Sequence, residues 1–240
     1  MSLTLALIHG WGVPKSVFNP MIEELPSSQF DEIISYEMPG YGSRSAEPFP
    51  KTIDALADDA REHIPSGALW LGWSLGAMVG IAAAEKSAES IGGLFLVSPT
   101  VRFFDADNAV AFEALCGGVE AHPKKALKRF CLSMPSPDNR SQLRKTIGEM
   151  VKQDIAGDVL LAGLEILKST DLSDPAARLD LPVKLIAGAD DAIIPVTHSQ
   201  HVGSLIRNSQ LDILPAGHLP FLECPKTFVE SLLEFAKTIA

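Results

Sequence analysis

The stretch that decides the fold is Ala68-Leu69-Trp70-Leu71-Gly72-Trp73-Ser74-Leu75-Gly76, followed by the Ala-rich segment 77–84. An apolar run here passes directly into a segment of helical character, so we expect a strand to turn into a helix at Ser74. G-x-S-x-G in that setting is typical of a nucleophile elbow, in which a sharp turn exposes a serine hydroxyl and glycines make room for the backbone. The alternative interpretation is a glycine-rich turn with an incidental serine.

Similar apolar runs recur on both sides of this stretch and predict strands buried on both faces. These runs are Leu3–Ile8, Glu32–Tyr36, Ala68–Gly72, Ile91–Val97, Val183–Ala187 and Gln210–Leu214. Amphipathic helical stretches separate most of them, at Lys15–Leu25, Thr52–His63, Leu75–Lys86 and Val196–Ile206, and a last helix is expected at Pro225–Ile239. This alternation predicts an α/β fold with a mostly parallel central sheet and helices on both faces.

The alternation is interrupted once, between residues 97 and 183. This stretch contains no convincing strand, and a structureless loop of that length is improbable in a compact domain. Helical patterns occur in it near Asn108–Leu115, Pro123–Leu132, Arg140–Gln153 and Ile155–Lys168. We therefore predict a core formed by residues 1–99 and 180–240, with residues 100–179 inserted as a helical lid.

A nucleophilic serine needs a base, and the base needs a carboxylate that orients it. His218 lies in the loop after the last predicted strand, at the same carboxyl edge of the sheet as Ser74. Asp190 and Asp191 follow the strand Val183–Ala187 at that edge, and the spacing G-x-x-D-x-x-x-P favours Asp191. Nucleophile, acid and base would then follow one another as Ser74, Asp191 and His218.

The tetrahedral oxyanion of such a reaction must also be stabilised. Backbone N–H groups of the residue after the nucleophile and of the loop after the first strand supply the donors in this arrangement. Those positions are Leu75 and Trp11, the latter within Ile8-His9-Gly10-Trp11-Gly12. Trp11 and Trp73 are also candidates for the pocket wall, whereas His9 is more consistent with a structural hydrogen bond than with a second base.

Composition excludes several other classes of protein. The chain has 240 residues with 46% hydrophobic and 21% charged residues, which is typical of a globular domain. A net charge of -10 argues against binding to nucleic acid. No apolar run is long enough to span a membrane, and no basic-then-apolar leader is expected at the start of the chain. Three cysteines without CxxC spacing favour a reducing compartment over disulfides or a zinc site, which predicts a cytoplasmic protein. We also expect a monomer without metal or cofactor.

At this point the chain resembles the α/β-hydrolase superfamily over its whole length. The segments that carry the resemblance occur in order: His9-Gly10-Trp11-Gly12, Pro39-Gly40-Tyr41-Gly42-Ser43-Arg44-Ser45, Gly72–Gly76, Asp191 to Pro195 and Gly217-His218. The resemblance implies an α/β-hydrolase fold with a Ser-His-Asp triad. The common N-terminal β-hairpin looks absent, and Ala77 stands where a glycine is frequent.

Within the superfamily, the elbow and parts of the lid are similar to the pimeloyl-[acyl-carrier protein] methyl ester esterases of biotin synthesis. The similarity extends to Gly163-Leu164-Glu165-Ile166-Leu167-Lys168 near the lid's end. It implies hydrolysis of a carrier-bound methyl ester to the free acid and methanol. It also implies that a lid segment lines the acyl channel, so that the substrate-binding residues are Trp11, Ser74, Leu75, Phe130, Cys131, Leu132, Ser133, Met134 and His218.

The lid differs in charge from the rest of the molecule. Residues 122–152 contain eight basic and two acidic residues, net +6, whereas the other 12 basic and 28 acidic residues give -16. Such a patch would attract an acidic partner such as an acyl carrier protein, although a solvated helix face would look the same. The candidate contacts are Lys124, Lys125, Lys128, Arg129, Arg140 and Arg144.

Three other functions remain open from the sequence. The same triad serves carbon–carbon bond hydrolases and lyases, and it serves general short-chain carboxylesterases. A non-enzymatic receptor could use the same pocket. A dehalogenase is disfavoured because it would need Asp at position 74.

Overall fold

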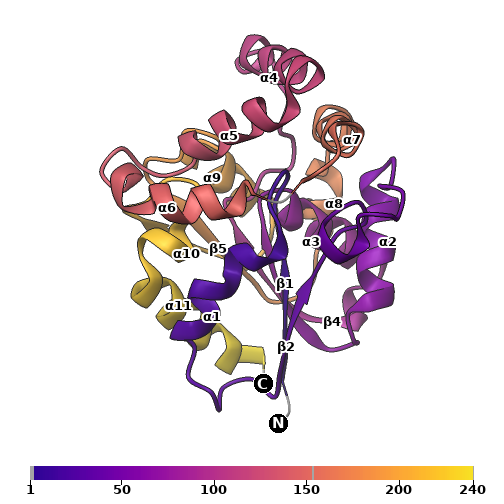
Figure 1. Cartoon of the computed structure of the whole chain (residues 1–240). Helices are drawn as coiled ribbons and strands as arrows, with labels where there is room; N and C mark the ends of the chain where they lie inside the picture. Colours follow the sequence, from indigo (N-terminus) through magenta and orange to yellow (C-terminus); the bar gives the residue numbers. More distant parts are fainter. Residues whose placement is uncertain (1–2, 153, 240) are drawn as a thin grey trace.

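A computed structural model describes residues 3–152 and 154–239. Its elements form one sheet, two helical layers on the faces of that sheet, and a group of helices above one end of the strands (Figure 1). The architecture is an α/β-hydrolase fold, as predicted.

The sheet contains six strands in the order β2-β1-β3-β4-β5-β6. They are β1 (Thr4–Ile8), β2 (Glu32–Tyr36), β3 (Ala68–Trp73), β4 (Ile91–Val97), β5 (Val183–Gly188) and β6 (Gln210–Leu214). All pairings between neighbouring strands are parallel, for example Leu5 with Leu69 and Ile8 with Gly72. Every residue of β3 is buried, which explains why this strand appears in the sequence as an uninterrupted apolar run.

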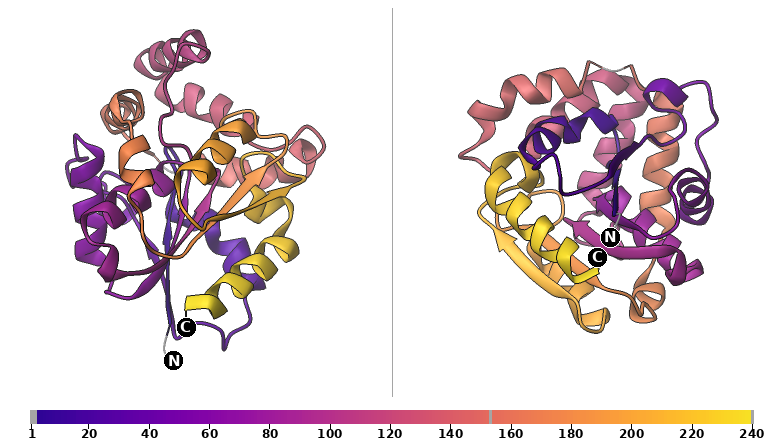
Figure 2. Two further views of the ribbon diagram at one scale, coloured as in Figure 1. Left: turned by 180° about the vertical axis from the view of Figure 1, so that it is seen from behind. Right: turned by 90° about the horizontal axis from the view of Figure 1, so that it is seen from below.

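The helical layers cover the two faces of the sheet (Figures 1 and 2). One face carries α1 (Asn19–Glu24), α10 (Pro220–Glu223) and α11 (Pro225–Ile239). The other face carries α2 (Ile53–His63), α3 (Leu75–Lys86), α8 (Ser173–Ala177) and α9 (Val196–Leu205). Short 3-10 helices complete the core at η1 (Lys15–Phe18), η2 (Gly42–Arg44) and η3 (Ala88–Ser90).

The first predicted helix, Lys15–Leu25, is wrong as a single element. The structure has a 3-10 turn followed by α1, which begins at Asn19 with Pro20 in its first turn. Proline lacks the N–H that would bond to the carbonyl of Ser16, so a continuous α-helix through this point would be broken.

The stretch between β4 and β5 is helical, as expected. It contains α4 (Ala109–Ala121), α5 (Pro123–Ser133), α6 (Arg140–Met150) and α7 (Gly157–Ser169), which we call the lid helices, and then α8. The lid helices stand above the carboxyl ends of the strands in the front view and in the view from behind (Figures 1 and 2). A hydrogen bond of 2.8 Å from the Leu172 N–H to the Val101 carbonyl joins the two ends of the insertion.

Two boundaries in the lid differ from the prediction by more than two residues. The first lid helix does not stop at Leu115 but continues through Gly117 and Gly118 to Ala121. Glycine costs about 1 kcal/mol in a helix, yet here it permits close packing, because Gly118 lies against Ala126 of α5. The third was expected to end at Gln153, a residue outside the described ranges, and its helix ends at Met150. The domain limits at residues 100 and 179 stay a prediction.

Candidate active site

Ser74 occupies the turn between β3 and α3 in a strained conformation. Its φ and ψ are 56° and -115°, a region that L-residues rarely adopt, and its N–H donates to the Val97 carbonyl at 2.9 Å. From residue 68 to residue 84 it is the only residue that is not buried. The turn therefore brings one hydroxyl to the surface of a cavity, next to the N-terminus of a helix.

The two glycines of the elbow are required by close backbone contacts. A Cβ atom on Gly72 would overlap the carbonyl oxygen of Gly76, and a Cβ on Gly76 would overlap the carbonyl oxygen of Ile8. Strand β3, helix α3 and the end of β1 thus approach one another more closely than any side chain would allow.

Asp191 and His218 form a buried pair. His218 Nδ1 lies 2.7 Å from Asp191 Oδ2, and the other carboxylate oxygen accepts the N–H groups of Ile193 (2.8 Å) and Ile194 (2.9 Å). Burial alone would raise the pKa of Asp191, but the charge of His218 and these hydrogen bonds outweigh it and lower the pKa. Asp191 is therefore held ionised, while its neighbour Asp190 is exposed and uses its N–H for the Ala216 carbonyl.

The main chain of His218 is held as firmly as its ring. Its carbonyl accepts the indole N–H of Trp73 at 2.8 Å, and its N–H donates to the Met134 carbonyl at 2.7 Å. The rings of Trp73 and His218 lie 5.3 Å apart. Trp73 thus fixes the histidine loop from within the core, and Met134 fixes it from the lid.

The loop after β1 brings Gly10 and Trp11 to the same cavity. His9 is fully buried, with Nδ1 2.9 Å from the Gly10 carbonyl and Nε2 accepting the Met38 N–H at 3.1 Å. Burial lowers the pKa of His9 to about 4, so this imidazole is neutral and structural. Within the described ranges, no main-chain carbonyl accepts a hydrogen bond from the backbone N–H of Trp11 or Leu75.

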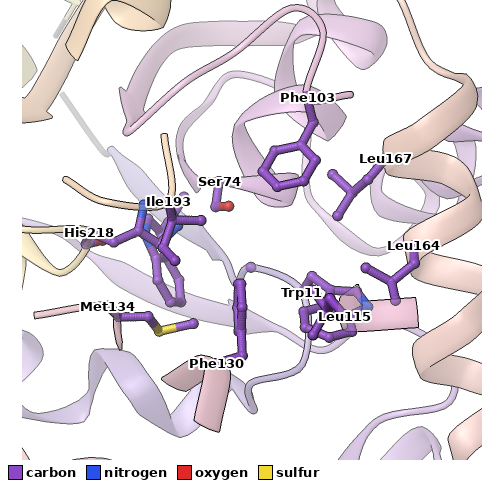
Figure 3. Close-up of a pocket in the computed structure, with 12 residues that line it drawn as sticks. Trp11, Ser74, Phe103, Leu115, Phe130, Met134, Leu164, Leu167, Ile193 and His218 are labelled. Atoms are coloured by element: carbon purple, nitrogen blue, oxygen red, sulfur yellow. The ribbon is translucent and has the colours of Figure 1, made fainter. Parts of the chain in front are cut away.

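Ser74 and His218 line one cavity together with residues of the lid (Figure 3). In Figure 3 the Ser74 hydroxyl stands among apolar side chains, with His218 on one side and Phe103 and Leu167 on the other. Among the hydrogen bonds of the described residues, none joins Ser74 Oγ to His218. Such bonds are often long before substrate binds. This cavity is narrow, with a volume of about 10 Å³.

A second and larger cavity of about 620 Å³ adjoins the first. Both cavities are bordered by Phe103, Leu115, Phe130 and Ile193. The larger one extends between α4 and α5, and its described lining is mainly apolar, with the basic side chains of Lys125 and Arg129 and no carboxylate. An extended apolar chain attached to a small reacting group would fit this pair of spaces.

The predicted lid segment 130–134 contributes only one face to these cavities. Phe130 and Met134, four residues apart, line the cavity at Ser74, and Ser133 lines the larger cavity. Cys131 is fully buried toward the core and Leu132 is 38% exposed, and neither lines a cavity. Helical periodicity explains this difference, since adjacent residues of α5 point in different directions.

The predicted basic contacts occupy several different positions. All are exposed, but only Lys125 and Arg129 also line the larger cavity, whereas Lys128, Arg140 and Arg144 lie elsewhere on α5 and α6. Lys124 forms a surface ion pair with Asp154 at 3.0 Å. The cations best placed to meet a substrate are therefore Lys125 and Arg129.

Several lining residues were missed by the sequence reasoning. Leu164 and Leu167 of α7, together with Phe103, Leu115 and Ile193, complete the wall at Ser74. The apolar spacing i, i+3 on α7 was visible, but a buried helix face and a cavity wall have the same pattern.

The part of the chain that the structure describes contains neither a metal site nor a membrane-spanning helix. No group of three or more His, Cys, Asp and Glu side chains there is placed to hold a metal ion. None of the helices in residues 3–152 and 154–239 has the length and apolar character needed to cross a membrane.

Proteins whose sequences match this chain share the name of one esterase. The chain is 31% identical to a pimeloyl-[acyl-carrier protein] methyl ester esterase of Edwardsiella ictaluri, covering 97% of this chain and 92% of that protein. It is 28% identical to the protein of the same name from Vibrio vulnificus, covering 97% and 93%.

Solved structures show the same fold at lower sequence identity. An esterase from Exiguobacterium antarcticum superposes with a TM-score of 0.87 at 19% identity, covering 98% of this chain and 92% of that one. An enol-lactonase from Burkholderia xenovorans superposes with a TM-score of 0.86 at 19% identity, covering 99% and 92%. The sequence model of the Alpha/beta hydrolase family matches residues 5–231, and the chain belongs to that family.

Proposed function

We propose that this α/β-hydrolase is a serine carboxylesterase that hydrolyses the methyl ester of pimeloyl-[acyl-carrier protein]. The observation that carries the proposal is the pair of adjoining cavities. The narrow space at Ser74 favours an ester of a small alcohol such as methanol, and the larger, mainly apolar cavity beyond it offers room for an acyl chain.

The chemistry follows from the positions of Ser74, His218 and Asp191. Ser74 Oγ attacks the ester carbonyl while His218 Nε2 takes the proton of the Ser74 hydroxyl. Ionised Asp191 stabilises the resulting imidazolium through its hydrogen bond to Nδ1. The backbone N–H groups of Trp11 and Leu75 are the donors for the tetrahedral oxyanion. His218 then protonates the departing methanol, and a water molecule hydrolyses the acyl-Ser74 ester by the same route.

The relatives support the choice of substrate within this chemistry. Proteins that share 28–31% of their residues with nearly the whole chain are named for the methyl ester of pimeloyl-[acyl-carrier protein]. A carbon–carbon bond hydrolase or lyase of the same fold would not need to form an acyl ester on Ser74. A trapped ester on Ser74, seen by mass spectrometry, would exclude that alternative and a receptor function.

The first experiment tests the nucleophile. Ser74→Ala should abolish turnover of the carrier-bound methyl ester, because the remaining backbone donors cannot form the acyl-enzyme. The exposed Ser66→Ala is the matched control and should keep full activity. Wild-type rates in a folded Ser74→Ala protein would overturn the assignment.

The second experiment tests the carrier protein. We propose that the exposed lid cations attract its acidic surface, with Lys125 and Arg129 nearest the cavity. Reversing both to Glu should lower kcat/KM for the carrier-bound ester by at least about tenfold and affect p-nitrophenyl acetate much less. The exposed Lys51→Glu, outside the lid, is the control. Equal effects on both substrates would mean that these cations do not recognise the carrier.

We also propose that the enzyme acts as a monomer in the cytoplasm, with a role in biotin synthesis. Support for a reducing compartment comes from Cys116, Cys131 and Cys224, which are free thiols in the structure. Rescue of a biotin auxotroph that lacks its methyl ester esterase would test the role, and sedimentation of the purified protein would test the monomer.

A further inference from the structure

The turn after α5 and the loop that carries His218 are in direct main-chain contact. Besides the hydrogen bond from His218 to Met134, a Cβ atom on Gly217 would overlap the Met134 carbonyl oxygen and the Ser136 nitrogen. Residue 217 therefore has to be glycine for this contact. The lid turn and the loop of the base are packed as one unit.

One carboxylate joins the two segments. Glu223, at the end of α10, accepts the Gly217 N–H on Oε1 at 2.9 Å. Its Oε2 accepts the Ser136 N–H at 2.9 Å and the side-chain amide of Asn139 at 3.1 Å. One oxygen thus binds the loop of the base, and the other binds the lid.

The chemistry of these bonds requires a carboxylate. All three partners are neutral N–H donors, and no ion pair of Glu223 occurs within the described ranges. An ionised carboxylate accepts hydrogen bonds on both oxygens, whereas a glutamine would place its own NH₂ group against one of the donors. Hydrogen bonds to a charged acceptor are also stronger than neutral ones.

We propose that Glu223 is a positioning residue for His218 and that it couples the lid turn 134–139 to the catalytic base. The proposal rests on the proposed function, in which His218 is the base. Glu223 holds Gly217, the residue before His218, in the position that lets the His218 N–H reach Met134. When the lid turn is bound to Glu223, the imidazole is aligned between Asp191 and Ser74.

The test compares Glu223→Gln with the wild type, using p-nitrophenyl acetate. We expect kcat to fall about tenfold, equivalent to about 1.4 kcal/mol at 25 °C, with KM changed less than about twofold. The low-field proton resonance of the His218–Asp191 hydrogen bond should shift or broaden. A purely structural role of Glu223 would lower the melting temperature without changing either property of the folded enzyme.

Two further variants keep the test decisive. Asn139→Ala removes the lid-side amide that donates to Glu223 and to the Ser136 hydroxyl, leaves the Gly217 bond to Glu223 intact, and should lower kcat about threefold by the same mechanism. Glu234→Gln is the matched control, since Glu234 is exposed on α11, and it should resemble the wild type. If Glu223→Gln does not fold, the kcat and the proton resonance of Asn139→Ala decide whether the lid turn is coupled to His218.

A folded variant with wild-type kcat and an unchanged resonance would refute the coupling. Because the Ser74→Ala experiment tests the esterase mechanism separately, the two failures are distinguishable. An inactive Ser74→Ala protein together with an unaffected Glu223→Gln protein would refute the positioning role of Glu223 and leave the esterase mechanism standing.

Discussion

The buried imidazole of His9 should make the protein less stable in mildly acidic solution. His9 is fully buried, and burial lowers its pKa from 6.5 to about 4. In the unfolded chain the same imidazole takes up a proton below pH 6.5. The unfolded state therefore binds more protons than the native state between about pH 6.5 and 4, and stability falls as the pH falls through that range.

The size of the effect follows from the two pKa values. With 6.5 in the unfolded chain and about 4 in the native protein, the linkage relation gives a loss of about 2 kcal/mol on going from pH 7 to pH 5. The contribution disappears only well above pH 6.5, where the imidazole is neutral in both states. A protonated His9 could no longer accept the Met38 N–H, so the loop that carries Trp11 would be disturbed as well.

The assay is urea unfolding at pH 7 and pH 5, with the same measurement on His9→Gln. Glutamine keeps a neutral acceptor for Met38, costs some stability at both pH values and cannot titrate. The variant should lose about 2 kcal/mol less than the wild type between pH 7 and 5. His63→Gln, at an exposed histidine, is the control. If wild type and His9→Gln lose the same free energy, the reasoning about His9 is refuted.

Three further predictions concern the active site and its surroundings. Asp191→Asn should lower kcat by about 10³ to 10⁴ while the protein stays folded, because the amide no longer stabilises the imidazolium; steady-state kinetics checks this, and a loss below tenfold would contradict it. Phe130→Ala should raise the ratio of kcat/KM for p-nitrophenyl octanoate to kcat/KM for p-nitrophenyl acetate by about tenfold, because Phe130 borders both cavities. An unchanged ratio would show that Phe130 does not limit the length of the acyl chain. Gly76→Ala should prevent soluble expression or cost at least about 3 kcal/mol in thermal unfolding, since its Cβ would overlap the Ile8 carbonyl; a stable, active Gly76→Ala protein would disprove that account.

The sheet could be predicted because its strands are buried on both faces. A strand such as β3 must be apolar throughout, and the glycines after it mark where the chain turns. The short helices α8 and α10 could not be predicted, because they contain too few residues to show a helical period. The break before α1 could have been predicted, since Pro20 prevents a continuous helix from Lys15.

The candidate triad could be predicted because each member follows a strand at one edge of the sheet. Asp191 and Asp190 are neighbours in sequence, yet only Asp191 is buried and only it contacts His218. The cavity wall could not be predicted in the same way. Phe103, Leu115 and Leu164 come from three separate segments, and their convergence depends on how the lid helices pack.

The fold and the triad leave the substrate undetermined, because the same framework supports many reactions. The lid contributes to the surroundings of Ser74 in two ways. Phe130 and Met134 shape the space beside Ser74, and the Met134 carbonyl also holds the main chain of His218. On the proposed mechanism, a change of lid sequence should therefore alter the selectivity for the acyl chain and the alignment of His218 together. Substitutions on the outer face of α5, at Lys128 for example, are free of the second effect, which makes them the better sites for separating carrier recognition from catalysis.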